Sequence, residues 1–113
     1  MALIRLCHTA ELEASGPAAA NSGRRLQVDA PDGRRLLVIE ADGQIHVIED
    51  DCPHQYFPLG DGNLQGTVLT CALLGWRFDL TDGRSLDMPG VCVERWQPVV
   101  EDGWISIEFT PLD

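Results

Sequence analysis

Residues 52–78 read CPHQYFPLGDGNLQGTVLTCALLGWRF, and this stretch carries the most informative pattern in the chain. It places a thiol and an imidazole two residues apart, at Cys52 and His54, and a second thiol, Cys71, after 16 intervening residues. Pro53 stiffens the tight segment between the first two donors by fixing its own φ. Each donor segment follows a β-type run, so we expect two neighbouring loops to converge at one end of a β-structure. Thiolate and imidazole are metal ligands, and the spacing therefore predicts a metal centre.

Short β-type runs separated by turn signals make up most of the chain. Asp-Gly pairs suit tight hairpins because both residues adopt positive φ at low cost. The five pairs lie at residues 32–33, 42–43, 61–62, 82–83 and 102–103. The predicted strands are Arg34–Glu40, Gln44–Glu49, Thr67–Cys71, Trp76–Leu80 and Trp104–Phe109. This pattern favours one all-β domain over residues 1–113, an antiparallel β-sandwich or small barrel.

Finer features can be predicted from the same pattern. The last strand alternates strictly, which predicts that Trp104, Ser106 and Glu108 lie on one face and that Ile105, Ile107 and Phe109 lie on the other. Thr9–Ala14 is predicted to form one helical turn capped by Thr9. The three tryptophans, Trp76, Trp96 and Trp104, are expected in the core.

The charge balance is strongly acidic, with 18 acidic residues against 8 arginines, no lysine and a net charge of −10. Such a surface repels phosphate backbones and anionic lipids, so nucleic-acid and membrane partners are excluded. It either steers the protein toward basic patches on another protein or serves solubility alone. Without a signal peptide or an apolar run near the required length of about 20 residues, the sequence predicts a cytoplasmic protein. Its cysteines (Cys7, Cys52, Cys71 and Cys92) are then candidates for metal binding or burial rather than disulfides.

The stretch 52–78 resembles the two ligand loops of Rieske proteins, C-x-H followed after about 16 residues by C-x-x-H. The CPHQ, GDG and GWRFD segments are most similar to the small 2Fe–2S ferredoxins of bacterial ring-hydroxylating and diiron oxygenase systems. The resemblance implies a Rieske-type β-sandwich with ligand loops at about 50–60 and 70–77. It also implies that Cys52 and Cys71 hold the inner iron and His54 the outer one. No cysteine flanks the ligands to brace the loops, which is typical of the disulfide-free ferredoxin branch.

The fourth ligand of the family pattern is missing. Leu74 stands at the second histidine position, and no histidine follows His54 in the sequence. Three outcomes stay open: another side chain completes the site, a cluster assembles on three ligands with water or hydroxide, or the site holds no cluster. Cys92 is the candidate substitute, because Met88–Val93 resembles the third loop beside the cluster in the family; its alternative role is buried packing. His46, His8 and Cys7 are expected to be structural.

The resemblance implies a one-electron carrier between a reductase and an oxygenase, not an enzyme in its own right. Its partners would dock at an apolar tip around Tyr56, Phe57, Leu73 and Leu74. The alternative is a cluster-free accessory subunit that docks through the same tip. The small subunits of some assimilatory nitrite reductases resemble this case, because they keep the fold without the metal. A mononuclear zinc or iron site on the same three donors is a weaker reading, because no general base is evident. The nearby aspartates, Asp50, Asp51 and Asp61, are expected to be solvated turn residues.

Overall fold

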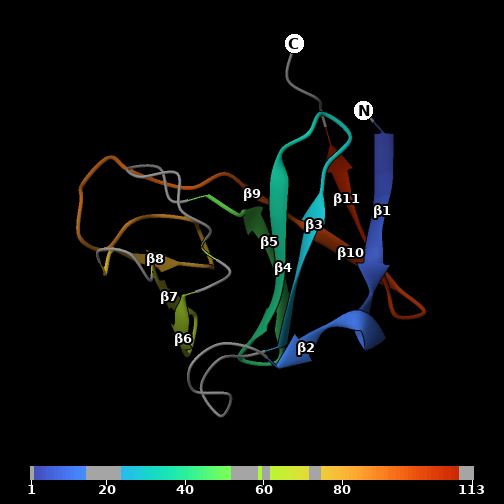
Figure 1. Cartoon of the computed structure of the whole chain (residues 1–113), viewed down its shortest axis with the longest axis horizontal. Coiled ribbons are helices and arrows are strands. Elements are labelled where there is room, and N and C mark those ends of the chain that lie inside the picture. The colour runs from blue at the N-terminus through green and yellow to red at the C-terminus, as the bar shows by residue number, and fades with distance from the viewer. Residues whose placement is uncertain (1, 15–23, 52–58, 60–61, 72–74, 110–113) are drawn as a thin grey trace.

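The computed structural model describes residues 2–14, 24–51, 59, 62–71 and 75–109, and its strands pair antiparallel in three sheets (Figure 1). One sheet has the order β1–β11–β10, formed by β1 (Ala2–His8), β11 (Trp104–Phe109) and β10 (Pro98–Glu101). The central sheet contains β2 (Glu13–Ala14), β3 (Arg24–Asp29), β4 (Arg35–Ala41), β5 (Gln44–Glu49) and β9 (Arg95–Trp96) in that order. The smallest sheet contains β6 (Asn63–Gln65), β7 (Val68–Thr70) and β8 (Arg77–Asp79). The prediction of an all-β fold with antiparallel sheets is therefore confirmed.

Two apolar clusters hold the three sheets together, one on each face of the central sheet. β4 contributes to both, because successive side chains of a strand point to opposite faces. Leu36 and Val38 pack with Ile105 and Ile107 of β11. Leu37 and Ile39 pack with the smallest sheet, in a cluster whose other buried members include Ile48, Leu59, Leu64, Leu69, Cys71, Phe78, Leu80 and Val93. Burial on both faces explains why β4 reads as a nearly continuous apolar run.

All five predicted strands agree with the structure within one residue at each end, and two of them, β5 and β11, match at both ends. In β11 the predicted alternation is confirmed, since Ile105, Ile107 and Phe109 are buried. Two of the predicted turns have positive φ at both residues: Asp42–Gly43 joins β4 to β5, and Asp102–Gly103 joins β10 to β11. These turns and the buried faces fix the register of both hairpins.

Two local predictions were wrong. The helical turn is a 3₁₀ turn at Thr9–Glu11, the only helical element among the described residues, and His8 caps it in place of Thr9. The His8 ring accepts a hydrogen bond from the Ala10 N–H, and the Glu11 carboxylate accepts one from the His8 N–H.

No helix in the described part of the chain is long and apolar enough to cross a membrane.

Trp104 was predicted in the core but is 38% exposed on the outer face of β11. It packs under the Arg5 guanidinium, 4.5 Å from the ring centroid, and meets the edge of the His8 ring. The other two predictions are closer to the structure, since Trp96 is buried and Trp76 packs, partly buried, against the cluster that contains Cys71.

Candidate metal centre

Of the residues predicted to make the site, Cys71 and Cys92 fall within the described residues. Cys52, His54, Tyr56, Phe57, Leu73 and Leu74 lie outside them, and so does Asp61. The described residues therefore show the strands and backbone that precede and follow the predicted ligand loops. The roles of Cys52 and His54 remain predictions.

Cys71 lies directly after β7, at the base of the second ligand loop. Its side chain is 1% exposed and belongs to the apolar cluster beneath the smallest sheet. Its N–H donates to the Trp76 carbonyl at 2.7 Å, and its carbonyl accepts from the Gly75 N–H at 3.0 Å. Gly75 has a φ of +80°, a conformation that costs glycine little. These two hydrogen bonds close the loop at its base and fix the backbone that carries the Cys71 thiol.

The end of the first loop lies against the start of the second. A Cβ atom added to Gly62 would lie 2.2 Å from the Thr70 carbonyl oxygen, so the two backbones touch just before Cys71. The Gly62 N–H also donates to the Leu59 carbonyl at 2.9 Å. The described ends of the two loops therefore share one point of the fold.

The start of the first loop is buried, which corrects the prediction that its aspartates are solvated. Asp50 is 0% exposed, its N–H donates to the Arg35 carbonyl at 2.9 Å, and its carboxylate accepts from Gln27 at 2.7 Å. Asp51, the next residue, is half-buried. Sequence reasoning missed these contacts because Gln27 lies 23 positions before Asp50.

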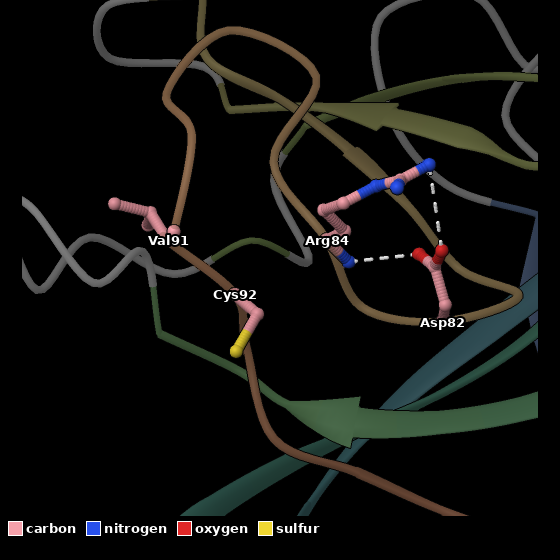
Figure 2. Close-up of a pocket in the computed structure, with 5 residues that line it drawn as sticks. Asp82, Arg84, Val91 and Cys92 are labelled. Carbon is pink, nitrogen blue, oxygen red and sulfur yellow. Dashed lines mark hydrogen bonds and ion pairs between the residues drawn. The ribbon is translucent and has the colours of Figure 1, made fainter.

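Cys92 is exposed, so the interpretation of this residue as buried packing was wrong. It lines a shallow pocket with Asp82, Arg84, Gly90 and Val91, and Figure 2 shows its sulfur pointing away from the Arg84–Asp82 ion pair. The described residues contain no group of three or more His, Cys, Asp or Glu side chains able to hold a metal. Within this part of the chain, Cys92 has no partners for a site of its own. Its role as a substitute ligand stays a prediction.

The third loop is attached to β8 through contacts that the sequence did not reveal. The Arg77 guanidinium and the Asp87 carboxylate pair at 2.9 Å, and the Arg77 N–H donates to the same carboxylate at 2.8 Å. These hydrogen bonds hold the pKa of Asp87 below its ordinary value. The Leu86 N–H donates back to the Arg77 carbonyl at 2.8 Å. These contacts hold the residues just before the third loop (Met88–Val93) beside β8.

Two of the remaining candidate donors, His8 and Cys7, have structural roles, as predicted. His8 caps the 3₁₀ turn, and Cys7 is buried in the cluster between the central sheet and the β1–β11–β10 sheet. Burial, and secondly the nearby Glu11 carboxylate, raise the pKa of the Cys7 thiol to about 11. Cys7 is therefore a neutral thiol at pH 7 and a poor ligand. His46 on β5 is 4% exposed.

His46 predicts a loss of stability in acid. Burial and then the nearby Arg95 charge lower the pKa of its ring below 6.5, an effect that Asp79 and the Leu80 and Ala41 carbonyls only partly offset. Below about pH 6.5 the unfolded chain therefore binds more protons than the folded one. The free energy of unfolding decreases as the pH is lowered through this range. We expect a contribution to this slope of at most about 1.4 kcal/mol per pH unit, the value for one proton.

Urea unfolding of the iron-free protein at pH 7.5 to 5 measures this slope. Replacing His46 with leucine removes the titrating group and fills its buried position with an apolar side chain of similar size. The variant should show a flatter profile over this range. An unchanged slope in His46→Leu would assign the acid sensitivity to other groups.

Comparison with known proteins shows one family and a consistent set of relatives. The Rieske [2Fe-2S] domain matches residues 3–97. The ferredoxin component of the alkene monooxygenase system of Xanthobacter autotrophicus is 31% identical over 78 residues, which cover 68% of this chain and 64% of that relative. The match thus spans less than two thirds of that relative's length. The ferredoxin component of the naphthalene 1,2-dioxygenase system of Pseudomonas aeruginosa is 32% identical over 72 residues, covering 64% of this chain and 69% of that protein.

A solved structure agrees with these relatives over nearly the whole chain. The ferredoxin of Sphingomonas yanoikuyae B1 superposes with a TM-score of 0.80 at 27% identity, covering 95% of this chain and 98% of that one. The three-sheet arrangement described above is therefore also the fold of a known ferredoxin.

Proposed function

The chain belongs to the Rieske [2Fe-2S] domain family, and from that membership we propose that it carries single electrons between a reductase and an oxygenase. The observation that carries the proposal is the donor set Cys52, His54 and Cys71, which lies inside the region matched by the family. Two relatives of the chain are ferredoxin components of a monooxygenase and a dioxygenase system. On this proposal the whole of residues 1–113 is one electron-transfer domain and not a catalyst in its own right.

The donors fit one iron fully and the other in part. Two thiolates, from Cys52 and Cys71, suit the inner iron of a Rieske cluster, and the His54 imidazole suits the outer one. The buried position of Cys71 among apolar side chains supports this assignment, because it keeps water from the thiolate. Leu74 offers no donor atom, so the outer iron of a bound cluster would need a ligand from another group or from solvent. When bound, the cluster would accept and release one electron.

The partners are proposed to dock at the tip formed by Tyr56, Phe57, Leu73 and Leu74. Among the described residues near the predicted third loop, Leu86 and Met88 are 40% and 42% exposed. Contiguous exposed apolar side chains are typical of protein docking sites, which is the basis for proposing the tip as one. The net charge of −10 favours basic partner surfaces and disfavours nucleic acid and anionic membranes. Such a carrier would work in the cytoplasm.

Iron and acid-labile sulfide content test this function directly, on protein purified without oxygen. We expect about two irons and two sulfides per chain, with visible absorbance from iron–sulfur charge transfer. The control is Cys71→Ala, which removes one inner-iron ligand at a buried position and should abolish the colour. A folded, colourless and iron-free wild-type protein would contradict the electron carrier.

Leu74 favours a second candidate, a cluster-free accessory subunit of a larger oxidoreductase. The domain would then keep the fold and the docking tip and lose the redox centre. The same measurement separates the two functions, because only the carrier requires iron and sulfide. A mononuclear metal on the three donors would give metal without sulfide.

A further inference from the structure

Two polar side chains of β3 face the first ligand loop from the central sheet. Arg25 and Gln27 are two residues apart, so both point to the same face of the strand, about 7 Å from one another. Their cross-strand partners on β4 are Ile39 and Leu37, which pack in the cluster that contains Cys71. Arg25 is 4% exposed. Because burial of a guanidinium is costly unless its N–H groups are used, its contacts indicate what it stabilises.

Arg25 reaches the end of the first loop. Its Nη1 donates to the Gly62 carbonyl at 2.8 Å in a buried hydrogen bond. Gly62 in turn touches the Thr70 backbone immediately before Cys71. Arg25 therefore holds the point where the end of one ligand segment meets the start of the other.

Gln27 reaches the start of the same loop. Its Nε2 donates to the Asp50 carboxylate at 2.7 Å, two residues before Cys52. The fully buried Asp50 is also attached through its N–H to the Arg35 carbonyl of β4. The start of the loop is thus tied to two strands of the central sheet.

We propose that Arg25 and Gln27 are positioning residues that attach the two described ends of the first ligand loop, Asp50 and Gly62, to β3, and that this attachment supports the ligand roles predicted for Cys52 and His54. The link to the cluster rests on the proposed electron-carrier function. The fixing of the two loop ends is a property of the polypeptide and can be tested without iron.

Residue-resolved amide hydrogen exchange on the iron-free protein, followed by NMR, is the test. Arg25→Met should speed exchange of the Gly62 N–H about 10- to 100-fold relative to core amides of β4 and β11, the range for losing one hydrogen bond with a charged partner. Gln27→Leu should do the same for the Asp50 N–H. Arg25→Lys, which keeps a cationic donor, should restore part of the protection of Gly62.

The neighbouring Arg24 offers a matched control. It lies on the same strand and also donates to two backbone carbonyls, those of Thr9 and Leu12, at the other side of the sheet. Arg24→Met should speed exchange of the Leu12 N–H, which donates to Thr9, and leave the Gly62 and Asp50 amides unchanged.

Equal acceleration of Gly62 and the core amides in Arg25→Met would overturn the proposal, since the arginine would then support only global stability. If Arg25→Met does not fold, Gln27→Leu decides by the same comparison at Asp50. In protein loaded with iron and sulfide, both variants should release iron to a chelator at least about 10-fold faster than Arg24→Met. If wild-type protein takes up no cluster, the carrier function fails while the exchange experiment still decides the role of the two residues.

Discussion

Replacing Leu74 with histidine is expected to convert a weakly held or absent cluster into a stable one. The change supplies the donor that the C-x-x-H spacing from Cys71 lacks, and it gives the outer iron two imidazoles. Loss of a residue that only hydrogen-bonds to a metal ligand weakens metal affinity by about 10- to 100-fold. Gain of a direct ligand should therefore slow iron release by at least that factor. Iron and sulfide content, with the rate of iron loss to a chelator, measure the effect.

Leu73→His is the matched control for this experiment. It makes the same chemical change one residue earlier, where the donor no longer has the C-x-x-H spacing. Leu74→His should hold about two irons and two sulfides and release iron at least about 10-fold more slowly than the wild-type protein, while Leu73→His should release iron at the wild-type rate. If the two variants lose iron equally fast, the loops have diverged beyond the missing ligand. If neither variant takes up iron, the accessory-subunit function gains support.

The sequence predicts the strands and turns of this fold well, because their causes are local. Asp42–Gly43 adopts the positive φ values that its composition favours, and the alternation in β11 directly separates its buried and exposed faces. A strand pattern does not show which polar side chain finds a distant partner. The burial of Asp50 depends on Gln27, and the burial of Arg25 depends on Gly62, 37 positions away.

The same limit applies to single residues whose role is set by their neighbours. Histidine is not among the preferred helix caps, and the sequence alone did not identify His8 as one. Trp104 is apolar enough for a core, yet a place on the outer face of β11 under Arg5 leaves it partly exposed. For the candidate site, spacing predicts the donors Cys52, His54 and Cys71, whereas the residues that hold their loops emerge only from the packing of three sheets.

Gly62→Ala is expected to be the most damaging single substitution at the junction of the two ligand loops. The added Cβ would lie 2.2 Å from the Thr70 carbonyl oxygen and 3.0 Å from that of Leu59. Both neighbours are backbone atoms that cannot rotate away, so the end of the first loop must move off β7. Overpacking of this kind costs about 3 kcal/mol or more, which corresponds to a fall in Tm of about 10 °C.

Gly33→Ala separates this steric effect from the loss of glycine as such. Gly33 has a φ of +92° with open space around its Cβ position, so alanine there meets only conformational strain, worth about 1 to 2 kcal/mol. Thermal unfolding of both iron-free variants gives the comparison. We also expect faster exchange of the Cys71 N–H in Gly62→Ala alone, because the second loop begins where the displaced backbone lies. Equal losses of stability in the two variants would mean that the loop junction can relax, and that the two ligand segments are not held together at Gly62.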